Sequence, residues 1–298
     1  MAAPKEEQRL SPEDDADAQR VPSSGGVELA VHDLGGDGPA LLFSHATGFH
    51  GRCYLPVAHE LSEIDRRHSV AFDFRGHGDT PRPPGEIEWQ RYGDDAEAMA
   101  SWLSEREGRP IDAFGHSMGG ACLLMAAHRQ PSLFRRLVLF EPIVFPPSGI
   151  RPDGAPSPMV AAARKRRSTF HTFRAAFDNF ASKPPLNAFT PEALHAYVDF
   201  GFARDRHGVH LKCSPDTEAS TFEKGGSHET WEHLPSIQTE VLVLAGRAGE
   251  MGPGAIAPQI SERLPRGRFL ELTQLDHFGP MVRPDIVARV IADALASA

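Results

Sequence analysis

The stretch Gly115-His116-Ser117-Met118-Gly119 decides the fold, because it stands between a short apolar run and a helix-forming run. The apolar run, residues 111–114, predicts a strand, and residues 120–127 predict a helix that ends before Pro131. A Gly-x-Ser-x-Gly turn between a strand and a helix is typical of a nucleophile elbow, in which a strained backbone lifts the serine hydroxyl above the sheet edge. The sequence therefore predicts that Ser117 is a nucleophile.

The same turn predicts a role for the backbone of Met118. Its amide stands at the N-terminus of the predicted helix, where unpaired N–H groups and the helix dipole favour negative charge. We therefore expect this amide to face a charge that forms beside the serine, as one donor of an oxyanion hole.

Length and composition indicate an enzyme-sized chain, for which we expect a small-molecule substrate. The 298 residues carry a formal net charge of -9, which argues against nucleic acid or an anionic membrane as a partner. No apolar run approaches the roughly 20 residues of a membrane span. The first residues are polar and acidic without an apolar signal core, so residues 1–24 predict a disordered tail and a cytoplasmic protein.

The sequence predicts neither a cofactor nor a metal ion. The three cysteines are scattered, and no His/Cys/Asp cluster has metal-ligand spacing. The glycine-rich stretches at 35–38 and 252–254 lack the strand–helix setting of a nucleotide loop and predict turns. The oligomeric state is left open.

Alternation of strands and helices predicts an α/β fold with a mostly parallel sheet. One block, from about Pro146 to Leu234, has no strand-like run but contains Phe-rich helical stretches separated by Pro and Gly. We therefore expect an α/β core formed by residues 25–145 and 236–298, with residues 146–235 inserted as a helical cap. Its basic cluster, residues 164–167, is interpreted as a solvated helix face rather than a site for an anionic partner.

Together these features resemble the α/β-hydrolase superfamily, from roughly residue 25 to the end of the chain. The resemblance rests on the element order, the elbow, Ser44-His45-Ala46-Thr47-Gly48, Asp73-Phe74-Arg75-Gly76-His77-Gly78 and a late His277. It implies a serine hydrolase with an inserted cap. It implies less about the substrate, because this fold hosts many chemistries.

His277 is predicted to be the base that removes the proton of the serine. It lies after the last predicted strand and before the final helix, where the resemblance places the catalytic histidine and where the order serine, acid, histidine is kept. His45 and His77 are expected to order loops, and His116, inside the elbow, is expected to point elsewhere.

The acid departs from the common pattern of the superfamily. The usual slot follows the penultimate strand, but Arg247-Ala248-Gly249 holds no carboxylate, and Glu250 comes one residue late. Glu141 directly follows an earlier strand, a place that is similar to one group of haloalkane dehalogenases. We favour Glu141, because His277 would supply a partner for a carboxylate at the mouth of a buried strand.

The resemblance also implies that Thr47 supplies the second oxyanion amide, after His45-Ala46 where relatives have His-Gly. The predicted function is a serine hydrolase that cleaves a small, largely apolar ester or lactone through an acyl-enzyme on Ser117. Two alternatives remain: a carbon–carbon bond hydrolase with the same three residue types, and a non-catalytic ligand receptor or scaffold that retains the triad.

Overall fold

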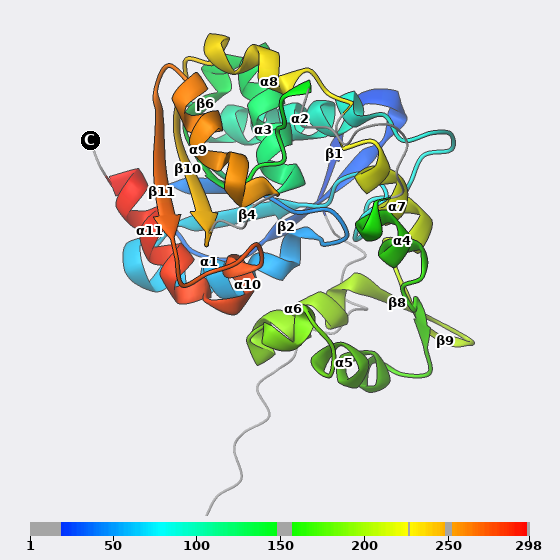
Figure 1. Ribbon diagram of the computed structural model, residues 1–298. Coiled ribbons are helices and arrows are strands. Elements are labelled where there is room, and N and C mark those ends of the chain that lie inside the picture. The colour runs from blue at the N-terminus through cyan, green and yellow to red at the C-terminus, as the bar shows by residue number, and fades with distance from the viewer. Residues whose placement is uncertain (1–18, 148–156, 226, 248–251, 297–298) are drawn as a thin grey trace, which may run out of the picture.

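A sheet of eight strands forms the centre of the computed structural model, which describes residues 19–147, 157–225, 227–247 and 252–296 (Figure 1). Its order is β1-β2-β4-β3-β5-β6-β10-β11. The strands are β1 (Arg20–Pro22), β2 (Glu28–Asp33), β3 (Ala40–Ser44), β4 (His68–Phe72), β5 (Ile111–His116), β6 (Phe134–Phe140), β10 (Glu240–Gly246) and β11 (Gly267–Leu272). β2 pairs antiparallel with β1 and β4, and the other neighbours are parallel. The predicted α/β class with a mostly parallel sheet is confirmed.

Helices cover both faces of this sheet (Figure 1). One face carries α1 (Leu55–Asp65), α10 (Gly279–Val282) and α11 (Pro284–Ala296), and the other carries α2 (Trp89–Glu107), α3 (Met118–Arg129), α8 (Thr230–His233) and α9 (Pro253–Arg263). Successive residues of β3 belong to different cores: Leu42 packs on the α3 side, whereas Leu41 and Phe43 pack on the α1 side. Because side chains alternate across a strand, a strand buried on both faces is apolar along most of its length. The buried Ser44 at the end of β3 is polar, and its hydroxyl donates to the carbonyl of Gly119 at 3.2 Å.

The chain between β6 and β10 leaves the sheet. It contains α4 (Pro158–Arg164), β7 (Thr169–Phe170), α5 (Phe173–Ala181), α6 (Pro191–Gly201), β8 (Phe202–Asp205), β9 (Gly208–Leu211) and α7 (Pro215–Glu223). In Figure 1, α5, α6 and the β8–β9 hairpin lie together, apart from the sheet. We keep residues 146–235 as the predicted cap.

The expectation that this block has no strand was wrong. β7, β9 and β8 form a small antiparallel sheet. These strands have only two to four residues each, so they show too little alternation to be recognised from the sequence. The turn between β8 and β9 ends at Gly208, whose φ of 138° favours glycine.

The N-terminal part of the described chain also differs from expectation. Arg20–Pro22 falls within the tail predicted to be disordered, yet it forms the edge strand β1, and Val21 is buried in the core. With β1 at the edge, β2 lies inside the sheet. The rest of the predicted tail, residues 1–18, lies outside the described residues.

Two further sequence expectations concern the surface. No helix among the described residues is long and apolar enough to cross a bilayer.

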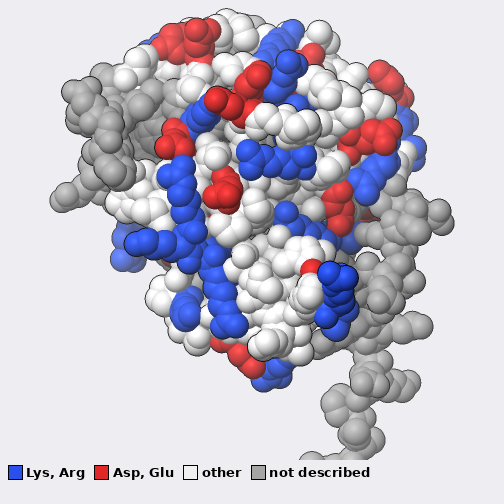
Figure 2. All heavy atoms as spheres, turned by 90° about the vertical axis from the view of Figure 1, so that its right-hand side faces the viewer, with Lys and Arg blue, Asp and Glu red and all other residues white. Residues whose placement is uncertain are grey.

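On the face that carries α4, α7 and the β8–β9 hairpin, Lys and Arg side chains are interspersed with Asp and Glu side chains (Figure 2). Arg164 pairs with Glu223 at 2.8 Å, and Arg166 pairs with Glu218 at 3.1 Å. The first pair is exposed and supports the interpretation of a solvated charged face, whereas Arg166 is mostly covered and pairs with a buried carboxylate, so the interpretation does not hold for Arg166.

Candidate active site

Ser117 lies at the junction of β5 and α3 with a strained backbone, φ 56° and ψ -115°. The glycines of the elbow permit this turn because neighbouring backbone atoms approach their Cα atoms closely. A Cβ on Gly119 would lie 2.0 Å from the carbonyl oxygen of Ser44, and one on Gly115 would lie 2.7 Å from Cα of Gly120. The turn therefore leaves no room for side chains at these two positions: at Gly115 because of the helix that follows it, and at Gly119 because of the backbone at the end of β3.

His277, in the turn between β11 and α10, faces this serine. Its Nε2 lies 3.2 Å from Oγ of Ser117, and its Nδ1 lies 2.6 Å from Oε2 of Glu141. A carboxylate only accepts hydrogen bonds, so Nδ1 carries the proton of the neutral ring. Nε2 is then free to accept the hydroxyl proton of Ser117.

Glu141 reaches His277 from the end of β6. It takes a left-handed backbone conformation, φ 45°, and its amide donates to the carbonyl of Leu244 at 2.8 Å. Its second carboxylate oxygen, Oε1, accepts from the amide of Gly246 at 2.9 Å, and the side chain is buried. Both oxygens of this carboxylate thus have partners. Glu250, the other candidate acid, lies outside the described residues.

The two predicted oxyanion amides belong to neighbouring segments, since Oγ1 of Thr47 lies 3.5 Å from Sδ of Met118. The carbonyl of Ala46 accepts from Nδ1 of His45 at 2.8 Å and from the amide of Phe49 at 3.1 Å. In a planar trans peptide the C=O and the following N–H point in opposite directions. These bonds therefore aim the Thr47 amide away from His45 and the amide of Phe49.

The Met118 amide is oriented in a similar way. The carbonyl of Ser117 accepts from the amides of Ala121 and Ile143, each at 3.2 Å. The amide of Met118 belongs to the same peptide plane and points away from these donors.

An aromatic cluster adjoins His277 through Phe278, whose ring centroid lies 5.6 Å from that of the histidine. Phe278, next to His277, lies 5.7 Å from Phe189 and 6.3 Å from Phe49, measured between ring centroids. Phe49 also contacts Tyr197 edge-on at 5.4 Å. Phe189 and Tyr197 come from the predicted cap, whereas Phe49 follows the Thr47 segment, so core and cap meet here on apolar rings.

His45 and His77 bond to backbone, as expected for residues that order loops. Nε2 of His45 accepts from the amide of Phe74 at 3.0 Å, and Nδ1 of His77 donates to the carbonyl of Arg75 at 3.2 Å. Burial lowers the pKa of His45 to about 3 and that of His77 to about 4. Both rings are therefore neutral near pH 7.

His116 does more than the sequence suggested. Its ring makes no bond to Ser117, but its Nε2 lies 2.8 Å from the backbone carbonyl of His277, and its Nδ1 lies 2.9 Å from the hydroxyl of Tyr54. Neither contact has a signal in the local sequence, because the three residues are far apart along the chain.

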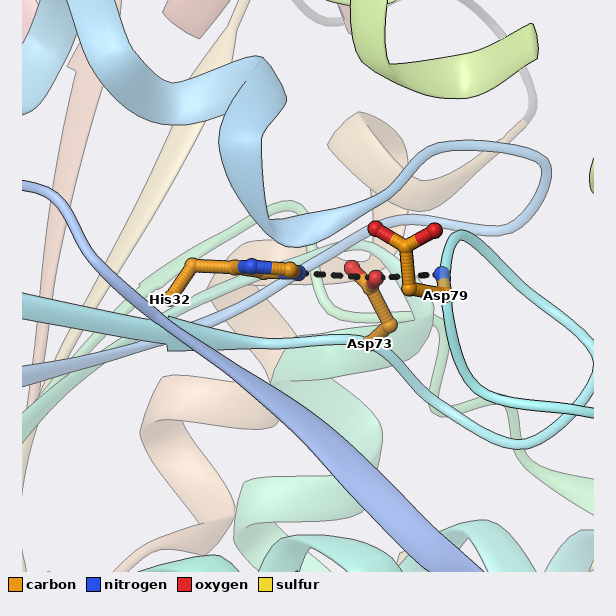
Figure 3. A group of neighbouring side chains, drawn as sticks. All are labelled: His32, Asp73 and Asp79. Carbon is orange, nitrogen blue, oxygen red and sulfur yellow. Dashed lines mark hydrogen bonds and ion pairs between the residues drawn. The ribbon is translucent and has the colours of Figure 1, made fainter. Parts of the chain in front are cut away.

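One group of side chains in the described part of the chain has metal-ligand chemistry: His32, Asp73 and Asp79 (Figure 3). The Asp73 carboxylate accepts from Nε2 of His32 at 2.8 Å and from the amides of Gly51 and Asp79 at 2.7 Å each. Burial by itself would raise the pKa of Asp73, but His32 holds it well below its usual value.

Asp79 in turn pairs with Lys212 at 2.5 Å. The Nε2 atom of His32, both oxygens of Asp73 and one oxygen of Asp79 are thus engaged in bonds that link β2, the loop after β4 and Lys212. A structural role accounts for the group without a metal ion.

Comparison with known proteins identifies the family of the chain. A model of the alpha/beta hydrolase family matches residues 41–290. The chain belongs to this family. The matched range includes the elbow residue Ser117, the carboxylate of Glu141 after β6 and the late His277.

Two curated relatives align with this hydrolase over nearly their full length. 2-(Acetamidomethylene)succinate hydrolase of Mesorhizobium japonicum is 24% identical over 90% of the chain and 92% of its own length. 2-Hydroxymuconate semialdehyde hydrolase of Pseudomonas putida is 23% identical over 97% and 98%, respectively.

Solved structures share the fold. The crystal structure of E-2-(acetamidomethylene)succinate hydrolase superimposes with a TM-score of 0.77 at 22% identity, covering 94% of this hydrolase and 99% of that chain. An esterase from Thermogutta terrifontis superimposes with a TM-score of 0.65 at 20% identity, covering 94% and 98%.

Proposed function

We propose that this hydrolase cleaves a small ester or lactone with a largely apolar part, through an acyl-enzyme on Ser117. One observation carries the proposal: a continuous row of hydrogen bonds runs from Glu141 through His277 to Oγ of Ser117. In this arrangement the carboxylate holds the imidazole in the reactive tautomer and stabilises the imidazolium that forms.

The mechanism begins with proton transfer from Ser117 to Nε2 of His277. The serine oxygen attacks the acyl carbon, and the amides of Met118 and Thr47 stabilise the oxyanion. The imidazolium returns its proton to the leaving group, which departs and leaves an ester on the serine. His277 then takes a proton from water, the hydroxide attacks the acyl carbon, and the protonated histidine restores the serine as the acid is released.

The aromatic cluster supports an apolar substrate portion. Phe278 packs against the His277 imidazole with ring centroids 5.6 Å apart, and Phe49 of the core and Phe189 of the predicted cap pack against Phe278. Apolar rings stabilise an apolar group mainly by removing its surface from water.

A serine-directed fluorophosphonate probe, followed by a panel of p-nitrophenyl esters of increasing acyl length and of lactones, tests this proposal. We expect labelling of the folded protein that S117A abolishes, and turnover of at least one ester or lactone. Absence of labelling in folded protein would favour the alternative of a non-catalytic receptor or scaffold.

A second candidate is the hydrolysis of a carbon–carbon or amide bond. The nearly full-length similarity to 2-hydroxymuconate semialdehyde hydrolase and to 2-(acetamidomethylene)succinate hydrolase favours it. The compounds named in these two enzyme names, 2-hydroxymuconate semialdehyde and 2-(acetamidomethylene)succinate, serve as probes. Loss of the absorbance of the semialdehyde, or release of acetate from the enamide, at rates well above ester turnover would replace the ester proposal by this one.

A further inference from the structure

His116 and Tyr54 connect two parts of the candidate active site that are remote in sequence. Nε2 of His116 faces the carbonyl oxygen of His277 at 2.8 Å. Nδ1 of the same ring faces the hydroxyl of Tyr54 at 2.9 Å, and that oxygen lies 3.3 Å from the amide nitrogen of Ala46. The row of contacts thus joins the backbone before Thr47 to the backbone of His277.

The chemistry of these groups fixes the direction of every hydrogen bond. A carbonyl oxygen only accepts, so Nε2 of His116 must donate to His277. In a neutral ring Nδ1 is then an acceptor, and it takes the hydroxyl proton of Tyr54. The oxygen of Tyr54 in turn accepts from the amide of Ala46.

The surroundings keep the side chains of His116 and Tyr54 neutral, so the directions of these hydrogen bonds do not change near neutral pH. Both residues are fully buried. Burial, reinforced by the nearby His277, lowers the pKa of His116 well below its usual value. Burial raises the pKa of Tyr54 well above its usual value.

Packing leaves the two rings little freedom. Tyr54 contacts Phe43 and Phe114 with ring centroids 5.8 and 6.0 Å away, and His116 contacts Phe140 edge-on at 5.7 Å. The rings of His116 and His277 lie 5.0 Å apart. A neutral His116 therefore places no second positive charge beside the imidazolium that forms on His277.

We propose that His116 and Tyr54 are positioning residues, which hold the His277 imidazole and the Ala46–Thr47 peptide at fixed positions relative to Ser117. The proposal rests on the function proposed above. The two ends of the row are the segments whose placement sets the Ser117–His277 distance and the direction of the Thr47 amide. A misplacement of about 1 Å in such groups reduces turnover by about a hundredfold.

The experiment compares Tyr54→Phe with Tyr92→Phe as a matched control. Tyr92 is equally buried and its hydroxyl contacts Thr221 at 3.0 Å, away from the site, so both changes remove one buried hydroxyl. We expect Y54F to lower kcat and the rate of fluorophosphonate labelling by about tenfold or more with KM nearly unchanged. Y92F should keep kcat within about twofold.

Two substitutions of His116 separate the two contacts of its ring. Gln reaches the position of Nε2 and keeps a donor for the His277 carbonyl, whereas Asn reaches only the position of Nδ1 and keeps an acceptor for Tyr54. If the contact with His277 positions the base, H116Q retains more kcat than H116N. Circular dichroism and thermal unfolding identify any variant that fails to fold, in which case the remaining variants decide.

A spectroscopic readout does not depend on turnover. The proton on Nδ1 of His277, bonded to Glu141, should give a far-downfield proton resonance that shifts or broadens in Y54F and H116N but not in Y92F. Unchanged resonance and kcat in folded Y54F and H116N would overturn the positioning role. Failure of the wild-type protein to label or turn over would instead overturn the proposed function, and the resonance alone would then decide the positioning role.

Discussion

The carboxylate of Glu141 and the imidazole of His277 lie 2.6 Å apart, although 136 residues separate them in sequence. The parallel neighbours β6, β10 and β11 explain this closeness. Glu141 follows β6 and His277 follows β11, and the ends of these strands meet at one edge of the sheet. Gly246 ends β10, the strand between β6 and β11, and its amide donates a hydrogen bond to the other oxygen of the Glu141 carboxylate.

Replacing Glu141 by Gln should reduce kcat by about 10³- to 10⁴-fold, because the amide can hold the imidazole in the unreactive tautomer and cannot stabilise the imidazolium. Turnover of the best ester, measured together with thermal unfolding, checks this. E250Q is the control. If E250Q abolishes turnover while E141Q does not, Glu141 is not the acid.

Replacing Thr47 by Val should change kcat by no more than about threefold, because the predicted donor is the backbone amide and removal of an oxyanion donor costs about 10²- to 10³-fold. The Thr47 hydroxyl contacts only Sδ of Met118 among the bonds described for it. Steady-state kinetics of the ester check the expectation. A loss of a hundredfold would assign the oxyanion contact to the hydroxyl.

Replacing Gly254 by Ala should lower kcat by about tenfold while the fold stays stable. A Cβ at this position would lie 2.9 Å from Oε1 of Glu141, so the carboxylate must move away from Gly246. Alanine favours helix by about 1 kcal/mol over glycine, which supports the first turn of α9. The exposed Gln259→Ala on the same helix is the control, and equal kinetics for the two variants would show that the carboxylate tolerates the contact.

Acidification should destabilise the fold between about pH 6.5 and 4. Burial lowers the pKa of His45 to about 3 and those of His50, His77 and His228 to about 4, and it lowers that of His116 well below the usual value. Below about pH 6.5 the unfolded chain binds protons that the folded chain excludes, so the free energy of unfolding falls as pH falls.

Each such histidine contributes a slope of about 1.4 kcal/mol per pH unit in this window, and the slope ends below the folded pKa values. Urea unfolding at several pH values between 7 and 4 measures it. A free energy of unfolding that stays constant over this range would show that these rings accept protons in the folded state.

Much of the fold follows from local sequence. Residues 40–43 are apolar throughout and form most of the buried strand β3. The elbow is indicated by glycines whose missing side chains allow Ser117 its strained backbone. The strands β7, β8 and β9 escaped prediction because they are too short for a period to show. β1 escaped because its three residues pair with β2 and contribute only Val21 to the core.

The site divides along the same line. The sequence by itself indicated the strained turn that presents Ser117 and the amide of Met118, because the glycines that such a turn requires lie within a few positions of the serine, although Gly119 also needs its missing side chain to pack on the backbone of Ser44. Only the tertiary structure decided that Glu141 meets His277, and that Tyr54 and His116 join the segment of Ala46 to that of His277. Such contacts depend on the order in which strands lie side by side, and no local pattern of residues contains that order.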